Sequence, residues 1–490
     1  MSVLETKAAK PAVDLKALAH QSMVDNGFLP DLPAEAAREV AALDGHVPAK
    51  DDVRDLRALP WSSIDNRESR DLDQIEVVEQ LPGGDVRVMI GIADVDWLMP
   101  PGSALDAHAA HNTCSVYTGV DVFPMLPERL SCDLTSLNFD ADRLAIVIEL
   151  VVDQGGTIKD GDVYRALVRN RAKLAYEDVS AWLSGGAIPP GVTEVPGLER
   201  QLRIQNDVAQ LLQALRFRHG ALDLETIEAR PVTVNGKIVS LAVTEKSHAR
   251  ELIEDFMIAA NGAMARFFDT KKRSSIRRVV KSPERWLRIV ALAKTHGATL
   301  PDEPDARALS EFLHDRKTKE KERFADLSLA VVKLMGPGEY ALERASGVHT
   351  GHFGLATQDY THSTAPNRRY ADLVTQRLLK AALTGARSPY SDEELATLAT
   401  RCTAKENDAR KVERTMRKVF AAMLLSDRIG DEFDAIVTGA TPNGTFVRLI
   451  SPPAEGRIVR GEQGLDVGDE LKVRLVATEP RKGFIDFARA

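Results

Sequence analysis

Three aspartates, Asp65, Asp71 and Asp73, stand close together in the first part of the chain. Carboxylates crowded within a few Å repel one another, and each raises the pKa of its neighbours. A divalent cation offsets this repulsion, and Mg²⁺ takes oxygen ligands at about 2.1 Å while keeping part of its water shell. The spacing therefore indicates a metal site, with a polar turn of solvated aspartates as the alternative.

A metal-bound group of carboxylates is suited to phosphodiester hydrolysis. One ion can generate the attacking hydroxide, and a second can stabilise the leaving oxygen. Arginine assists such chemistry, because a guanidinium grips a phosphate through two hydrogen bonds and offsets charge that grows in the transition state. Two consecutive arginines, Arg368 and Arg369, occur in a polar stretch far downstream of the aspartates.

The two stretches together resemble the ribonuclease II (RNB) family of 3′→5′ exoribonucleases. The first is similar to the family pattern I-D-x-x-x-x-x-D-x-D-D, and the second to H-F-G-L…Y-x-x-x-T-S-P-I-R-R-Y-x-D. Three shorter motifs match in order between them: Gly91-Ile92-Ala93-Asp94-Val95, Gly102-Ser103-Ala104-Leu105-Asp106 and Pro124-Met125-Leu126-Pro127. The resemblance covers about residues 50 to 430.

The resemblance implies a role for each residue of the metal site. Asp65, Asp71 and Asp73 would bind the ion, and Asp73 would be tied most directly to the chemistry. Gln74 stands where the family carries a fourth acid. Its amide oxygen can ligate Mg²⁺, but one negative charge is lost. Arg368 matches the first arginine of the family motif and is expected to grip the phosphate. The expected ion is Mg²⁺, with Mn²⁺ as its substitute.

Four residues are expected to bind RNA. Single-stranded RNA is gripped by stacking on aromatic side chains, and only 5% of this chain is aromatic. By the resemblance, Tyr117 clamps nucleotides and Tyr176 lies near the 3′-terminal base. Glu413 matches a glutamate that contacts the ribose hydroxyls of the terminal nucleotide, and Arg369 adjoins the phosphate contact. The alternatives are core packing for the tyrosines, a helix-surface ion pair for Glu413 and a helix-start ion pair for Arg369.

Composition limits the kind of protein. The chain has 490 residues, of which 44% are hydrophobic and 28% charged, as expected of a soluble globular protein. A net charge of −8 argues against binding nucleic acid over the whole surface, so RNA contacts must be local. The sequence lacks the run of about 18 apolar residues that a membrane span requires. Three widely spaced cysteines fit a reducing cytoplasm, and we expect a monomer that contacts no membrane.

The catalytic region is predicted to be mixed α/β. Nearly unbroken apolar runs at 86–95 and 144–152 are typical of strands buried on both faces. Periodicity predicts helices over 198–217, 249–268, 283–296, 305–315, 324–336, 366–385 and 391–429. Pro366 is expected to open the helix over 366–385. Basic runs at 271–281, 316–323 and 405–418 can line an RNA path or form solvated helix faces.

The N-terminal part is predicted to be helical. Apolar residues recur at helical spacing over 15–19 and 37–43, and a third short helix is expected from Asp51 to Ala58. The three helices would form a helix-turn-helix unit, with or without a wing, or a spacer packed on the catalytic domain. Ribonuclease II relatives usually carry cold-shock OB-folds at this place, and we expect none here.

The C-terminal part changes character. Short alternating strands are expected at 435–437, 445–449, 457–459, 471–475 and 484–487. Five strands at this spacing fit an OB barrel. The details Val437-Thr438-Gly439 and Asp466-Val467-Gly468-Asp469 look like an S1-type RNA-binding domain, with an unrelated small barrel as the alternative.

The sequence thus predicts a multi-domain α+β protein. An N-terminal helical domain would span 1–58, a mixed α/β RNB catalytic core 59–430, and an S1-type OB-fold barrel 431–490. The predicted activity is Mg²⁺-dependent hydrolysis of single-stranded RNA from its 3′ end to nucleoside 5′-monophosphates, with some ability to approach or enter structured RNA. One alternative is a catalytically weak RNA-binding protein, which Gln74 motivates. The other is a metal-dependent endonuclease or phosphodiesterase.

Overall fold

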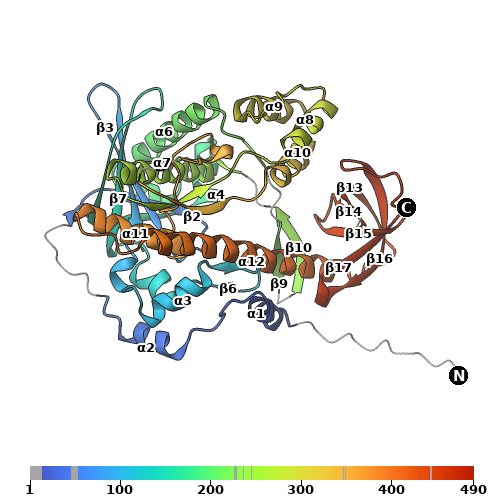
Figure 1. Ribbon diagram of the computed structural model, residues 1–490, viewed down its shortest axis with the longest axis horizontal. Helices are drawn as coiled ribbons and strands as arrows, with labels where there is room; N and C mark the ends of the chain where they lie inside the picture. The colour runs from blue at the N-terminus through green and yellow to red at the C-terminus, as the bar shows by residue number, and fades with distance from the viewer. Residues whose placement is uncertain are drawn as a thin grey trace.

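A six-stranded sheet forms the centre of the catalytic region (Figure 1). The computed structural model describes residues 14–45, 53–225, 229–234, 237–243, 246–345, 347, 349–441 and 444–490. The strand order is β1 (Arg54–Asp55), β8 (Ile158–Ala175), β2 (Trp61–Asp65), β3 (Gln74–Gln80), β4 (Val86–Ala93) and β7 (Asp142–Val152). The first part of β8 pairs with β7 and the last part with β2, so this long strand links β7 back to β2.

Apolar side chains hold the sheet against its helices. β4 and β7 pair with Ile90 opposite Ile148, and both side chains are fully buried, as the unbroken apolar runs predict. Helix α7 (His248–Thr270) packs on β2, β7 and β8, while α6 (Leu198–Arg218) packs on β3. In Figure 1 these two helices lie above the sheet and α3 (Ala104–Asn112) lies below it. The mixed α/β core is therefore confirmed.

The remaining helices extend from this core. α8 (Trp286–Thr295), α9 (Ala306–Lys319) and α10 (Lys321–Met335) pack around an apolar cluster of their own. α12 (Asp392–Leu425) starts with a capping box at Ser391 and runs from the core to the C-terminal barrel (Figure 1). The shorter helices and strands are α4 (Tyr176–Leu183), α5 (Pro190–Thr193), β5 (Val116–Tyr117), β6 (Val122–Phe123), β9 (Ala229–Val234), β10 (Lys237–Val243), β11 (Ser275–Val279) and β12 (Glu339–Glu343). Single turns of 3₁₀ or π helix lie at Asp96–Leu98, Arg129–Leu134, Phe353–Leu355 and Pro480–Lys482.

The C-terminal residues close into a five-stranded barrel. Its order is β13 (Glu432–Thr441), β14 (Gly444–Leu449), β15 (Glu455–Arg460), β17 (Phe484–Arg489) and β16 (Glu470–Glu479). The alternation seen in the sequence has its usual cause, since Phe433, Val447, Val473 and Phe487 point into one apolar core. The end of α12 contributes Leu425 to that core, which ties the barrel to the catalytic region.

The N-terminal segment differs from its prediction. α1 (Leu15–Asp25) packs on α12, whereas α2 (Ala34–Ala42) packs on α3. The third helix expected from Asp51 to Ala58 is wrong within the described residues, because Arg54–Asp55 pairs with β8 as β1. Residues 1–13 and 46–52 of the predicted domain lie outside the described residues. A helical segment packed on the catalytic core, one of the two alternatives, is what the described part forms.

One helix start also needs correction. α11 (Tyr370–Leu383) begins after Arg369 and not at Pro366. The residues between them form a turn in which the amide of Arg369 donates to the carbonyl of Ala365 at 3.0 Å. This turn carries Arg368. Within the described part of the chain, no helix is long and apolar enough to cross a membrane.

Candidate active site

The loop between β2 and β3 carries the predicted metal-site aspartates. β2 ends at Asp65 and β3 begins at Gln74, so the loop joins two neighbouring strands of the central sheet. Ser136 fixes the loop, because its hydroxyl donates to the carbonyl of Arg70 at 2.8 Å and accepts from the amide of Leu72 at 2.9 Å. The carboxylates are therefore held on a braced backbone.

Asp73 faces the turn that precedes α11. It is 3% exposed, and its Oδ1 accepts a hydrogen bond from the amide of Asn367 at 3.1 Å. Nε of Arg368 lies 3.6 Å from the other carboxylate oxygen, and the Arg368 side chain is 46% exposed. Burial raises the pKa of Asp73 to about 7, opposed by the charge of Arg368 and reinforced by that of Asp71. A buried acid thus meets a guanidinium that solvent and substrate can reach.

The other two aspartates lie close enough to interact with this pair. Oδ1 of Asp65 accepts hydrogen bonds from the amide of Asn66 at 2.6 Å and the hydroxyl of Ser69 at 2.9 Å. Burial raises the pKa of Asp71, and the negative charge of Asp65 adds to that rise. Gln74 is buried next to Asp73 at the start of β3. Asp65, Asp71 and Asp73 therefore lie close enough to act on one another electrostatically, while Gln74 is placed beside them only by its position at the start of β3.

Tyr117 and Glu413 meet near Arg368. The amide of Tyr117 donates to Oε1 of Glu413 at 3.1 Å, and the amide of Ser115 donates to the carbonyl of Arg368 at 3.1 Å. Tyr117 is 44% exposed, so it is not a core residue. Burial raises the pKa of its phenol to about 12. The charge of Arg368 opposes this rise, and the charges of the acidic group around Asp71 reinforce it. Tyr117 therefore borders the acidic site, and Glu413 holds its backbone.

Tyr176 lies at the start of α4, against an arginine that the sequence did not reveal. The guanidinium carbon of Arg250 lies 4.4 Å from the centre of the Tyr176 ring. Nη2 of Arg250 also donates to Oδ1 of Asn66 at 2.7 Å, next to Asp65. Arg250 lies outside the motifs described for the sequence, and the fold places it beside the tyrosine and the metal-site loop.

Arg369 forms the ion pair that the sequence left as its alternative role. Its Nη2 lies 2.7 Å from Oδ1 of Asp372 and its Nε donates to Oδ2 at 2.9 Å. Oδ1 of Asp372 also accepts from the amide of Ala365 at 2.8 Å. Arg369 thus braces the turn that carries Arg368. A direct contact of Arg369 with RNA stays a prediction.

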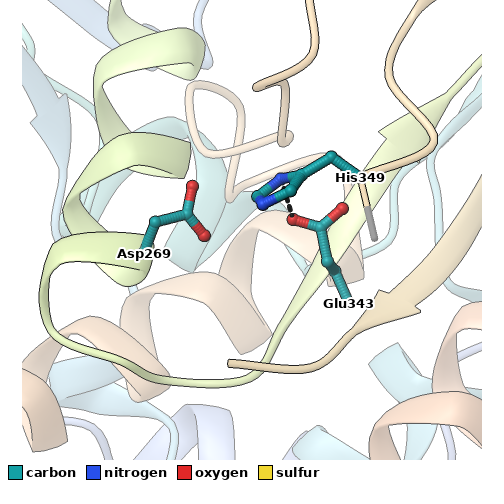
Figure 2. A group of neighbouring side chains, drawn as sticks. All are labelled: Asp269, Glu343 and His349. Atoms are coloured by element: carbon teal, nitrogen blue, oxygen red, sulfur yellow. Dashed lines mark ion pairs between the residues drawn. The ribbon is translucent and has the colours of Figure 1, made fainter. Parts of the chain in front are cut away.

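A second acidic cluster lies apart from this site. Among the described residues, Asp269, Glu343 and His349 form one group whose possible ligand atoms all lie within 4.8 Å of one another (Figure 2). Nδ1 of His349 lies 2.9 Å from Oε1 of Glu343. Arg277, which is 2% exposed, makes ion pairs with both acids, at 3.2 Å from Glu343. This cluster already contains a buried cation, which opposes the binding of a metal ion.

The residues around Asp73 fit a divalent cation better. Their carboxylate and amide oxygens are the hard donors that Mg²⁺ prefers, and its retained waters bridge donors that are spaced more widely than in a closed cage. Burial is the main cause of the raised pKa values of Asp71 and Asp73, and the charges of neighbouring acids add to it. A bound cation would offset both effects. The cation against Asp73, Arg368, is half-exposed and lies beyond hydrogen-bond distance.

Comparison with known families identifies the protein family. A family model described as RNB domain matches residues 53–385. The chain belongs to the RNB family. A second model, described as RNase II-type exonuclease C-terminal S1 domain, matches residues 431–490. The prediction of an S1-type barrel is thereby confirmed, and the alternative of an unrelated small barrel is wrong.

Individual relatives of this RNB protein agree with that assignment. Ribonuclease R of Thermotoga maritima is 30% identical over 514 residues, which cover 97% of this chain and 70% of the relative. The structure of Mycoplasma genitalium RNase R in complex with ribose methylated single-stranded RNA aligns with a TM-score of 0.89 at 24% identity, covering 97% of this chain and 78% of that one. A structure of the same protein in complex with double-stranded RNA aligns with a TM-score of 0.86 at 24% identity, covering 97% of this chain and 83% of that one.

The fold alone does not decide activity. The structure of yeast Ssd1, a pseudonuclease, aligns with a TM-score of 0.73 at 18% identity over 95% of this chain and 58% of that one. The family and the curated relatives do decide the enzyme class, which is that of a hydrolytic, metal-dependent exoribonuclease. The predictions of fold, family and enzyme class are confirmed, and the role of each site residue stays a prediction.

Proposed function

We propose that this RNB protein degrades single-stranded RNA from the 3′ end, as a cytoplasmic monomer, and releases nucleoside 5′-monophosphates. The observation that carries the proposal is the meeting of buried Asp73 with half-exposed Arg368 beside two further acids. That arrangement supplies negative charge for a metal ion and a guanidinium for a phosphate. A protein that only bound RNA would need the guanidinium but not the crowded, buried acids.

Asp65, Asp71, Asp73 and the amide oxygen of Gln74 would hold Mg²⁺, or Mn²⁺ in its place. When bound, the ion supplies a nucleophile at neutral pH and offsets charge on the phosphate. Arg368 donates to a phosphate oxygen and stabilises the charge that grows there. The backbone amide of Asn367 keeps the Asp73 carboxylate oriented during this step.

The aromatic residues would grip the end of the RNA. Tyr117, which is 44% exposed, offers a face on which a base can stack. Tyr176 would contact the terminal base, with Arg250 behind its ring. Glu413, held next to Tyr117, would contact the ribose hydroxyls and so favour RNA over DNA. The S1-type barrel would bind RNA further from the 3′ end.

The relatives support an extension to structured RNA. A protein of the same fold has been solved with double-stranded RNA, and here α1 packs on α12 while α2 packs on α3. We therefore propose that the enzyme digests a 3′ overhang close to a stem and enters the stem as base pairs fray.

End-labelled RNA tests the activity. The 5′-labelled strand should shorten one nucleotide at a time in Mg²⁺, with nucleoside 5′-monophosphates as the released product, and should stay intact in EDTA. Asp73→Asn serves as the inactive control, and a DNA strand of the same sequence tests the ribose contact. Internal fragments would instead indicate an endonuclease, and the absence of any product would indicate an RNA-binding protein without activity.

A further inference from the structure

Glu76 is a buried acid that the proposed mechanism does not use. It lies in β3, two residues beyond Gln74, and its relative exposure is 0%. Both carboxylate oxygens lack a hydrogen-bond partner among the described residues, and so does the hydroxyl of Ser62 opposite it on β2. Native proteins rarely bury a polar group without a partner, because the lost hydration is not replaced. An unpaired carboxylate inside the sheet therefore calls for a ligand.

The strand geometry places Glu76 behind the metal site. Successive side chains of a strand alternate between its faces, so Glu76 and Gln74 point to the same side of β3. Glu76 is opposite Ser62, and β2 continues from Ser62 to its end at Asp65. Burial raises the pKa of Glu76 well above its usual range, and the negative charge of Asp65 adds to that rise. The negative charges of Asp65 and Glu76 both raise the pKa of the Tyr176 phenol, so the three side chains lie in one region.

A neutral Glu76 does not resolve the problem. A protonated carboxyl carries an O–H donor, and this donor needs an acceptor in the same way that the carboxylate needs donors. Neither Glu76 oxygen has a partner of either kind among the described side chains and backbone. No ion pair of the described residues includes Glu76 either, in contrast to the buried acids Asp94 and Asp372. A cation at the Asp65 end of β2 and β3 would satisfy it.

The number of acids in the site indicates a role for Glu76. The family pattern has four acids, and Gln74 removes one of them here. We propose that Glu76 is the fourth carboxylate of the metal site and supplies, from two residues further along β3, the charge that Gln74 lacks. The proposal rests on the proposed function for the presence of a metal ion, and it adds which residue completes the ligand charge.

Metal binding to the full-length protein without RNA tests this directly, so that activity is not the only readout. Mn²⁺ binding, followed by its electron paramagnetic resonance signal, is compared for wild type, Glu76→Gln, Gln74→Asp and the double variant. Loss of the Glu76 charge should weaken Mn²⁺ binding about 10–100-fold, and Gln74→Asp in the same background should restore most of it. Glu79→Gln, at an exposed position of the same strand, is the matched control and should bind as wild type does.

The outcomes separate the two proposals. If Glu76→Gln binds Mn²⁺ like the wild type while Asp73→Asn binds it weakly, the role of Glu76 is overturned and the proposed function stands. If the wild type binds Mn²⁺ with the expected dependence on Glu76 but leaves RNA intact, the proposed function fails and the metal-site role stands. A wild type that binds no divalent ion would overturn both. Should Glu76→Gln not fold, Glu76→Met, which also removes the charge, gives the second measurement, and unchanged Mn²⁺ binding by that variant would also overturn the role.

Discussion

Two acidic clusters in the described part of the chain have opposite electrostatic settings. Around Asp73 the acids are crowded, and the nearest guanidinium is half-exposed at 3.6 Å. Around Glu343 the possible ligand atoms lie within 4.8 Å of one another, yet a fully enclosed arginine, Arg277, makes ion pairs with two of the three residues. Close approach of ligand atoms is therefore a poor guide to a metal site. The better guide is whether the negative charge already has a buried cation.

The largest expected effect comes from removing charge at the first cluster. Asp73→Asn should abolish RNA cleavage while RNA affinity stays within a few-fold of wild type, because the change removes a proposed metal ligand and leaves the RNA-contacting surface in place. Turnover and RNA binding are measured separately on the same preparation. Asp269→Asn is the matched variant in the second cluster and should leave turnover per folded molecule unchanged. Equal losses in both variants would erase the distinction between the clusters.

The arginine of the first cluster should act in catalysis. Arg368→Ala should lower turnover about 10²–10³-fold, since a donor aimed at growing charge in the transition state is typically worth that much. Steady-state kinetics on a short RNA provides the measurement, with Arg368→Lys as the variant that keeps the charge but loses the bidentate geometry. An effect confined to KM would mean that Arg368 only anchors the substrate.

The arginine of the second cluster should act in stability. Arg277→Met should lower the free energy of unfolding by about 3–5 kcal/mol, because two acids would lose their buried partner. Denaturant unfolding measures this, with Lys271→Met at a nearby exposed position as the control. The comparison also predicts that Mn²⁺ partly restores the stability of Arg277→Met, since Asp269, Glu343 and His349 would then be able to bind it. Equal stabilisation of the wild type and Arg277→Met by Mn²⁺ would contradict the role given to Arg277, because only the variant should gain a second binding site.

The smallest expected effect is at Gln74. Gln74→Asp should lower the Mg²⁺ concentration for half-maximal activity by less than about tenfold, because Glu76 already supplies part of the missing charge. A titration of activity with Mg²⁺ measures the change. An unchanged titration would mean that residue 74 does not touch the ion. A much larger gain would mean that the wild-type site lacks a fourth charge and that Glu76 does not contribute.

Local sequence determined much of this protein. The apolar runs of β4 and β7, the helical periodicity of α6 and α7, and the alternation of the barrel strands are set by neighbouring residues, and all of them are found where the sequence placed them. The types and spacing of Asp65, Asp71 and Asp73 likewise identified the acidic site. Local patterns failed at the segment before Ala58, where pairing with distant β8 replaced the expected helix.

Only the tertiary structure decided which charged groups are paired. The hydrogen bond from the amide of Asn367 to Asp73 joins residues 294 positions apart, and no local pattern encodes such a contact. In the same way, Arg277 and Arg278 belong to a basic run that suggested an RNA path, but both are buried in ion pairs. In the sequence, Glu76 resembles any polar strand residue. Only the structure shows that its carboxylate is buried without a hydrogen-bond partner among the described residues. The reason is physical: the free energy of a charge depends on burial and on nearby charges, and both are set by distant parts of the chain.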